Sequence, residues 1–346
     1  MERRTRCSSS GIGSTELTLA QETTLSGTDP SDRSVSAQFA HRHTIGEIFL
    51  VGQVIKQGDL FLSTGQVPRS NLYFNDHLGR ESGADPLVLI EMVRQTASCI
   101  AHEYLSVPLD YKFVLNRLDF DIDEMSADQL GERRTVTLVS RPSIERHRRG
   151  IPLAVSTDVD LVHNGITIGR VSHNTTFLPP SVYSALRRSS VTRGGANEPA
   201  VELTEVNQIL ARSVGRLNPV NIVISDPVIT GADTLECVVE PHFSNPSMFE
   251  HGQDHVPGMV VLEAARQAAA LQVGVSPRLL SGTLVFHRFI ETDVVARLRS
   301  LLSHKDEDRR SFHGDVRDSD GEILTEYRIA VREEGEVSQW RPQSLR

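Results

Sequence analysis

The sequence predicts an α+β protein made of two similar halves, each with one antiparallel sheet packed on a single long helix. Residues 85–97 read DPLVLIEMVRQTA and residues 257–269 read PGMVVLEAARQAA, so one helix-like segment occurs twice. Strand-like runs follow each copy in the same order, with a hairpin signal before the last run, at Asn164-Gly165 and at Asp320-Gly321. Strands grouped after a helix favour α+β over α/β, and the repeat indicates a duplicated module.

The first half is expected to begin with strand-like runs over residues 45–51 and 59–67. A helix is expected from Pro86 to about Leu105, because Asp85 can cap it and a proline suits the first helical turn, where no amide partner is needed. Four strands are expected after it, at Lys112–Ile122, Thr135–Arg141, Leu153–Val162 and Ile166–Leu178.

The second half repeats this order. Its helix is expected from about Gly258 to Val273 and is rich in alanine. Small side chains let a sheet curl closely around a helix, which is the composition expected of a hot-dog module. The strands are expected at Ile222–Thr230, Leu235–Val239, Thr283–Phe289, Val294–Leu302, Ser311–Arg317 and Ile323–Val331.

The remaining segments are read as tails and a linker. At 346 residues, two domains of ordinary size are expected rather than one core. Residues 1–39 are rich in Ser, Thr, Gly and charge and are expected to be disordered. The other predicted segments are a first module over 40–180, a linker over 181–215 with a short helix near Glu202–Leu210, a second module over 216–335, and a tail over 336–346.

Composition argues against several classes of protein. The net charge of −9 argues against nonspecific nucleic-acid binding. The cysteines Cys7, Cys99 and Cys237 form no CxxC pair, which argues against a zinc site or a disulfide framework. No apolar run approaches the roughly 18 residues that a membrane span needs, and the N-terminus lacks the apolar core of a secretory signal. A cytoplasmic protein without a membrane partner is therefore expected.

Four segments carry a resemblance to a known family: HRHTIGEIFL (41–50), PRSNLYFNDH (68–77), DPLVLIEMVRQ (85–95) and MFEHGQDHVPGMVVLEAARQ (248–267). They resemble the A-factor biosynthesis, or AfsA-type, family of γ-butyrolactone signal synthases, over about residues 41–333. Both halves are also similar to the β-hydroxyacyl-carrier-protein dehydratases. The resemblance implies a tandem hot-dog fold, in which two antiparallel sheets each wrap a central helix and pair as an internal pseudo-dimer. The sequence leaves open whether two chains associate.

The resemblance also implies an activity. AfsA-type proteins are acyltransferases that join a β-ketoacyl thioester, held by a carrier protein or coenzyme A, to the hydroxyl of dihydroxyacetone phosphate. The product is a phosphorylated β-ketoacyl ester, the precursor of a γ-butyrolactone, butenolide or furan signal, and no metal or redox cofactor is implied. Two alternatives stay open, because one fold supports many chemistries. They are a dehydratase or thioesterase of acyl thioesters, and a non-catalytic regulator that binds an acyl group or signal.

Two repeated carboxylates are the main catalytic candidates. Glu91 and Glu263 lie on helices expected to be buried, where a carboxylate is costly unless it is paired. The functional interpretation is a general base whose pKa is raised by desolvation. The alternative is a helix ion pair, with Arg94 or Arg266 three residues later.

The neighbouring polar residues are candidates for substrate binding. Arg94 and Arg266 could bind the acceptor phosphate, because a guanidinium makes paired, charge-assisted hydrogen bonds, or they could hold the glutamates. Gln95 and Gln267 are expected to anchor the helices. Arg69 matches the Pro-Arg element of the family, with a surface turn as its alternative.

Loop histidines and the start of the second helix complete the set. His77, His251 and His255 precede the helices and could shuttle protons, or they could simply lie in exposed loops. The spacing of His251, His255 and Glu263 does not favour a metal site. Gly258 opens the second helix, whose free amides could stabilise a thioester oxyanion. We expect Gly258, Glu263 and His77 to form the more complete site, shared between the modules.

Overall fold

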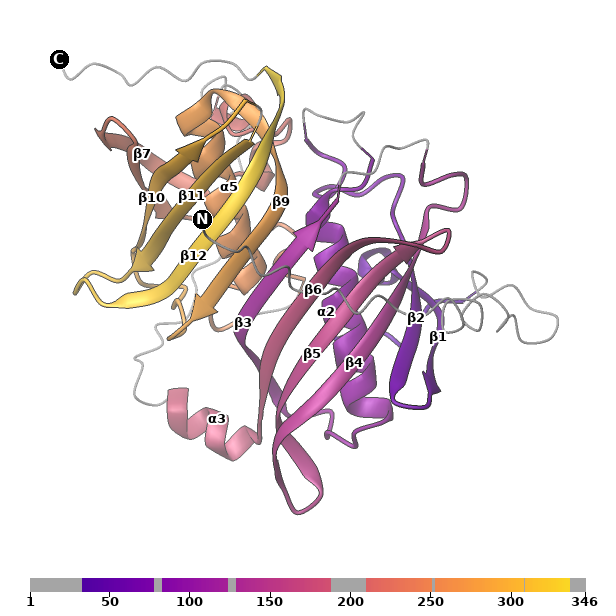
Figure 1. Ribbon diagram of the computed structural model, residues 1–346. Helices are drawn as coiled ribbons and strands as arrows, with labels where there is room; N and C mark the ends of the chain where they lie inside the picture. The colour runs from indigo at the N-terminus through magenta and orange to yellow at the C-terminus, as the bar shows by residue number, and fades with distance from the viewer. Residues whose placement is uncertain are drawn as a thin grey trace, which may run out of the picture.

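The computed structural model of the protein describes residues 33–77, 83–123, 129–187, 210–250, 253–307 and 309–336. Within them the chain forms one antiparallel sheet that wraps around two long helices, α2 (Pro86–Glu103) and α5 (Gly258–Val273) (Figure 1). Neither these helices nor any other in the described ranges is long and apolar enough to cross a membrane.

The first half has its helix and strands in the predicted order. Asp85 caps α2 by accepting a hydrogen bond from the N–H of Leu87 at 3.0 Å, and Pro86 is the first helical residue. The strands of this half are β1 (Leu50–Gln57), β2 (Leu60–Gln66), β3 (Lys112–Ile122), β4 (Thr135–Arg148), β5 (Ile151–His163) and β6 (Ile166–Leu178).

The second half repeats the first. Helix α5 is buried along its whole alanine face and ends at Gly274, whose φ of 71° is a left-handed conformation that suits glycine. The strands of this half are β7 (Ile224–Gly231), β8 (Thr234–Val239), β9 (Val275–Phe286), β10 (Ala296–Lys305), β11 (Arg309–Arg317) and β12 (Ile323–Glu336).

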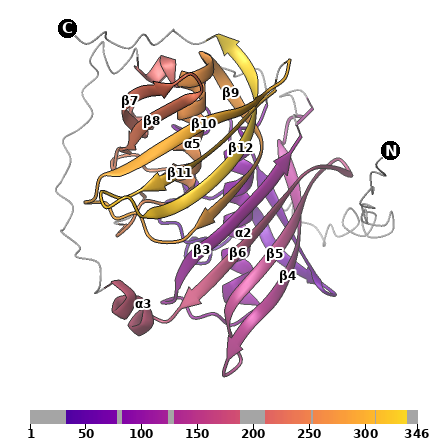
Figure 2. The same ribbon diagram turned by 60° about the vertical axis from the view of Figure 1, so that its left-hand side comes forward.

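The two halves join into one sheet of twelve strands, in the order β1-β2-β4-β5-β6-β3-β9-β12-β11-β10-β8-β7. Counted outward from the centre, β3-β6-β5-β4-β2-β1 mirrors β9-β12-β11-β10-β8-β7. The seam is an antiparallel pairing of β3 with β9, from Arg117 opposite Val285 to Asp121 opposite Ser281. Figure 2 shows β3 and β9 side by side between the halves. The predicted tandem hot-dog fold with an internal pseudo-dimer is confirmed.

Two elements differ from the sequence prediction. Ile45–Glu47 is a short 3-10 helix rather than a strand. β9 begins at Val275 rather than at Thr283, although it contains Pro277. Proline is tolerated there because only residues 281–285 of β9 pair with β3, so the start of β9 is an edge.

The expected linker also contains regular structure. Helix α3 (Pro180–Arg187) follows β6 directly, within residues that were expected to be a linker. Pro179-Pro180 was read as a loop signal, but a proline at the start of a helix costs nothing, since that N–H has no partner within the helix. Apart from Leu210, the short helix expected near Glu202–Leu210 lies outside the described residues.

The seam gives a test of the pairing of the halves. Gly282 of β9 lies opposite Phe120 of β3, and a Cβ at this position would come within 2.6 Å of the Phe120 ring and 3.0 Å of the carbonyl oxygen of Arg328. We expect Gly282→Ala to lower the free energy of unfolding by about 1–3 kcal/mol through overpacking. Urea denaturation measures this, with Gly231→Ala on edge strand β7 as the matched control, since its Cβ would meet only Thr234 at 3.4 Å. Equal stability of both variants would contradict a tightly packed seam.

Candidate functional site

Each half builds a buried polar cluster around the glutamate of its helix. In the first half Glu91, which is 2% exposed, accepts hydrogen bonds from Arg94 Nε at 2.8 Å and from Gln95 Nε2 at 2.8 Å. A second arginine, Arg42, donates to Glu91 through Nη2 at 2.6 Å. Arg94 also donates to the carbonyl oxygen of Ala40 at 3.1 Å. Two cations and an amide therefore compensate one buried carboxylate; we call this group the first cluster.

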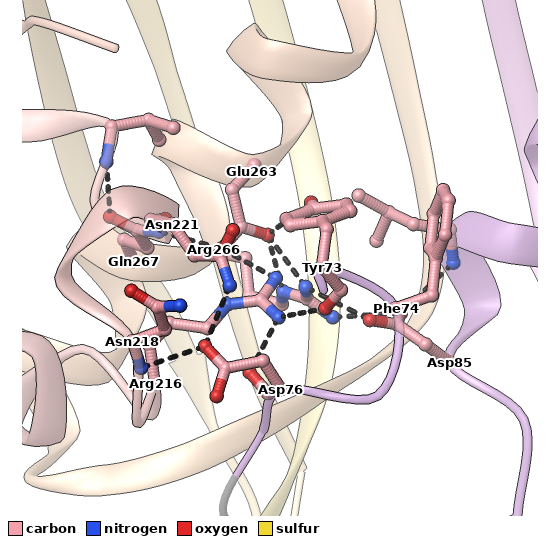
Figure 3. A network of polar contacts seen from close by, with 12 residues as sticks. Tyr73, Phe74, Asp76, Asp85, Arg216, Asn218, Asn221, Glu263, Arg266 and Gln267 are labelled. Atoms are coloured by element: carbon pink, nitrogen blue, oxygen red, sulfur yellow. Dashed lines mark hydrogen bonds and ion pairs between the residues drawn. The ribbon is translucent and has the colours of Figure 1, made fainter. Parts of the chain in front are cut away.

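The second cluster repeats this pattern around Glu263, which is fully buried. Arg266 Nε donates to Glu263 at 2.8 Å, Gln267 Nε2 at 2.6 Å, and Arg216 Nε at 2.9 Å (Figure 3). Arg42 and Arg216 each lie three residues before a short 3-10 helix, Ile45–Glu47 or Pro219–Asn221. The duplication thus includes an upstream arginine as well as the helix residues.

The glutamines hold each helix against the 3-10 helix of its own half. Gln95 donates to the carbonyl oxygen of Glu47 at 2.8 Å and accepts from the N–H of Phe49 at 2.9 Å. Gln267 makes the same pair of bonds with the carbonyl oxygen of Asn221 and the N–H of Val223. Both amides are fully used in these bonds and in their bonds to the glutamates, which supports an anchoring role.

The loop before each helix crosses to the other half. Asp76 of the first half accepts hydrogen bonds from the N–H groups of Leu217 and Asn218, at 3.2 and 2.9 Å. In the same way Glu250 of the second half accepts from the N–H groups of the two residues after Arg42. Each cluster is therefore built from both halves of the chain.

Two side chains from the first half close the second cluster. The hydroxyl of Tyr73 donates to Glu263 at 3.0 Å, and Asp85 pairs with the two terminal nitrogens of Arg266 at 2.9 and 3.1 Å (Figure 3). The equivalent positions at the first cluster are occupied by Ser247 and Pro257, which are smaller or carry no charge. Asp85 and Pro257 both precede the first residue of a helix.

The two clusters consequently differ in the space beside them. A cavity of about 900 Å³ has Arg42, Glu91, Arg94 and Gly258 in its wall. The space at the second cluster, between His77, Asp85, Arg216 and Arg266, is only about 20 Å³. Ligand pockets usually measure about 300–1,000 Å³. Only the first cluster therefore lies beside a cavity of substrate size.

This placement corrects the expected grouping of the site. Gly258 lines the cavity of the first cluster together with Glu91, whereas Glu263 lies in the closed second cluster. The reason is the crossing of the loops, which brings the start of α5 to the glutamate of the other half. His77 lies at the closed cluster, and His255 lines the cavity.

Two predicted site residues lie away from the cavity or outside the described ranges. Arg69 is exposed and donates to the carbonyl oxygen of Glu132 at 2.6 Å, in keeping with a surface turn. His251 lies outside the described residues. Within the described ranges, no three His, Cys, Asp or Glu side chains come together as a metal site would require.

The direction of the glutamate pKa values also differs from the prediction. Burial raises the pKa of Glu91, but the charges and hydrogen bonds of Arg42 and Arg94 outweigh burial and lower it to about 2. Burial likewise raises the pKa of Glu263, and Arg216 and Arg266 reverse this so that the net shift is downward. Burial lowers the pKa of His77 to about 4. Glu91 and Glu263 are therefore held ionised, and neither is a base with a raised pKa.

Several important residues were missed by sequence reasoning. Arg42 and Arg216 supply half of the positive charge at the clusters, and the pairing of Asp85 with Arg266 was not predicted. Aligning the repeat further upstream would have revealed the arginines, because Arg42 and Arg216 stand at matching distances before the short 3-10 helices. Asp85 and Arg266 lie in different halves of the chain, so no local sequence pattern predicts that they pair.

This chain is similar to a described sequence family and to several known proteins. The sequence model of the A-factor biosynthesis hotdog domain matches residues 23–179 and 201–307, which include both repeated helices. A Streptomyces coelicolor protein named 2-oxo-3-(phosphooxy)propyl 3-oxoalkanoate synthase is 30% identical over 260 residues, covering 75% of this chain and 79% of that protein. A Streptomyces virginiae protein of the same name is 29% identical over 237 residues, covering 68% and 76%. The solved 12:0-ACP thioesterase from Umbellularia californica aligns with a TM-score of 0.49 and 13% identity, over 81% of this chain and 100% of that one.

The closed cluster should be critical for stability. Asp85→Asn keeps a helix cap but leaves Arg266 without its second carboxylate, so we expect the free energy of unfolding to fall by about 3 kcal/mol or more. The matched control is Glu322→Gln, which breaks an ion pair with Arg288 whose side chains are 59% and 61% exposed, and we expect a loss below about 1 kcal/mol. Urea denaturation compares the two. Similar losses would contradict a structural role for the second cluster.

The first cluster should make stability depend on acid. The pKa of Glu91 is lowered in the folded state, to about 2 from 4.5, so protons bind the unfolded chain more readily. Its contribution, about 3 kcal/mol, is complete above about pH 5 and is lost as the pH falls toward 2. We expect Glu91→Gln to lose less stability than the wild type across this window. Parallel curves of unfolding free energy against pH would show that the carboxylate is not held as described.

Proposed function

The chain belongs to the A-factor biosynthesis hot-dog family, and from that premise we propose that it is an acyltransferase. The reaction joins a β-ketoacyl thioester to the free hydroxyl of dihydroxyacetone phosphate and releases a thiol. The name of its relatives describes such a product, an ester of a 3-oxoalkanoate with a 2-oxo-3-(phosphooxy)propyl group. We propose this ester as the precursor of a γ-butyrolactone-type signal.

The cavity at the first cluster is the observation that carries the proposal. Part of its wall is apolar and suits the acyl chain of the donor, while another part presents the polar groups of the first cluster. An enzyme that joins a fatty acyl group to a phosphorylated alcohol needs both kinds of surface in one space. The apolar wall includes Ile100, Leu105, Phe113, Leu115 and Phe177.

Arg94 is the best candidate for binding the phosphate. Its Nε and Nη2 are engaged by Glu91 and Ala40, whereas its Nη1 makes no hydrogen bond within the described ranges. The Arg94 side chain is 35% exposed, compared with 8% for Arg266, whose guanidinium is fully paired in the closed cluster. A guanidinium fixed on one edge and open on the other is well suited to a phosphate.

The start of α5 supports stabilisation of the oxyanion. Gly258 and Pro257 lie in the cavity wall, and no side chain among the described residues caps this helix. The first amides of a helix have no partner within it, and the helix dipole adds positive potential at that end. The thioester carbonyl could therefore accept hydrogen bonds here as negative charge develops on its oxygen.

Glu91 acts in this proposal as an anchor rather than as a base. Its lowered pKa makes it a poor acceptor for the proton of a hydroxyl. What it does is hold Arg42 and Arg94 in fixed positions beside the cavity. Fixed charges that need no reorganisation during the reaction are the form in which electrostatic catalysis is strongest.

The direct test incubates the purified chain with dihydroxyacetone phosphate and β-ketoacyl thioesters of several lengths, on carrier protein and on coenzyme A. Mass spectrometry should detect the phosphorylated ester in the wild type. Free β-keto acid without ester would favour a thioesterase, and an α,β-unsaturated thioester formed from a β-hydroxyacyl thioester would favour a dehydratase. Binding of the thioester without turnover would favour a regulator.

Replacing Arg94 should weaken recognition of the acceptor. For Arg94→Gln we expect KM for dihydroxyacetone phosphate to rise by about 10- to 100-fold, the loss of a charge-assisted hydrogen bond. The fold should survive, because Glu91 keeps its bonds to Arg42 and Gln95. The preference for dihydroxyacetone phosphate over dihydroxyacetone should shrink in steady-state assays, while the exposed control Arg288→Gln keeps it. An unchanged preference would assign the phosphate to another residue.

A further inference from the structure

The cavity wall holds a second group of polar residues, which is separate from the first cluster. Asp254 and His255 come from the loop before α5, and both line the cavity together with Tyr183 of α3. We propose that His255 is the general base of the transfer reaction and that Asp254 positions it; this inference rests on the proposed function.

The geometry of the pair orients the imidazole. His255 Nδ1 lies 2.8 Å from Asp254 Oδ1, so a proton on Nδ1 is held by the carboxylate. This leaves Nε2 as the nitrogen with a lone pair, and it makes no hydrogen bond to any of the described residues. The carboxylate also stabilises the imidazolium that forms when Nε2 takes up a proton.

Helix α3 and a segment after β9 hold this pair in place. The Tyr183 hydroxyl lies 2.8 Å from both carboxylate oxygens of Asp254. Arg187 donates to the carbonyl oxygen of Asp254 at 2.5 Å and pairs with Glu291 at 2.6 Å. The ring of His255 and the guanidinium of Arg187 both pack on Phe289, at 4.8 and 4.9 Å.

Helix α3 therefore supports the wall of the cavity rather than only linking the two halves. Tyr183 and Arg187 of α3 both contact Asp254, and Arg187 also pairs with Glu291 and packs on Phe289, the ring that His255 contacts. The result is a carboxylate–imidazole pair braced from several sides, beside the amides proposed for the oxyanion. The first cluster offers no comparable base, since Glu91 is tied to two arginines.

In the proposed reaction His255 acts first as a base and then as an acid. His255 Nε2 takes the proton of the acceptor hydroxyl while that oxygen attacks the thioester carbonyl carbon, so that a C–O bond forms and the carbonyl electrons move to oxygen. The tetrahedral intermediate then collapses, which restores the C=O bond and breaks the C–S bond. The leaving thiolate takes the proton back from Nε2. The products are the ester and a thiol, and the imidazole returns to its starting form.

The test combines kinetics with chemical rescue. For His255→Ala we expect kcat to fall by about 100-fold or more, with KM for dihydroxyacetone phosphate changed by less than about threefold. Added imidazole should restore part of kcat, because it can occupy the vacated space. Asp254→Asn should also lower kcat without imidazole rescue, since its base is still present but wrongly oriented. The matched control is His313→Ala, on the exposed surface of β11. It should keep the kcat of the wild type, both with and without added imidazole.

The outcomes separate this inference from the proposed function. If the wild type forms ester and the folded His255→Ala variant keeps its kcat, or loses it without imidazole rescue, His255 is not the base and the acyltransferase proposal stands. If His255→Ala fails to fold, His255→Gln replaces it, and wild-type kcat in that variant overturns the inference. A wild type that forms no ester overturns both.

Discussion

The structure depends on one constraint: a carboxylate buried under a sheet has to be neutralised by cations that are buried with it. Each helix carries its glutamate into a buried site, and only part of the compensating charge comes from the same helix. The upstream arginines and the crossing loops supply the rest. Asp85 of one half pairs with Arg266 of the other, and Asp76 and Glu250 hold backbone amides across the same boundary. The halves are thus joined by charge as well as by the β3–β9 seam.

Because the module is duplicated within one chain, its two buried clusters can have different roles. At the second cluster Tyr73 and Asp85 fill the space and complete the charge pairing, which makes the site a structural joint. At the first cluster Ser247 and Pro257 stand in the equivalent places, the space stays open, and one edge of Arg94 faces it. The same fold therefore forms a closed structural contact at the second cluster and an open pocket at the first. The difference arises from two positions in the loops, not from the helices that carry the repeated motif.

Much of this architecture can be read from the sequence, because periodicity and turn signals are local. The two helices and the order of the strands along the chain follow from such signals, whereas the pairing of the halves follows from the resemblance to hot-dog proteins. The grouping of the site does not. Whether Gly258 faces Glu91 or Glu263 depends on how the loops cross, and the sign of a pKa shift depends on arginines distant in sequence, such as Arg42, which lies 49 residues from Glu91. Long-range contacts of this kind leave no periodic trace.

The asymmetry of the two clusters has a consequence for how such a chain can evolve. In a dimer of identical subunits, any substitution alters both copies of a site, so a change that improves packing in one place damages reactivity in the other. Fusion of the copies removes that coupling. Residues around Glu263 can then be selected for stability alone, while substitutions around Glu91 can change which acyl or alcohol substrates are accepted. Lineages descended from one ancestral gene could in this way diversify their chemical messages without destabilising the scaffold that makes them.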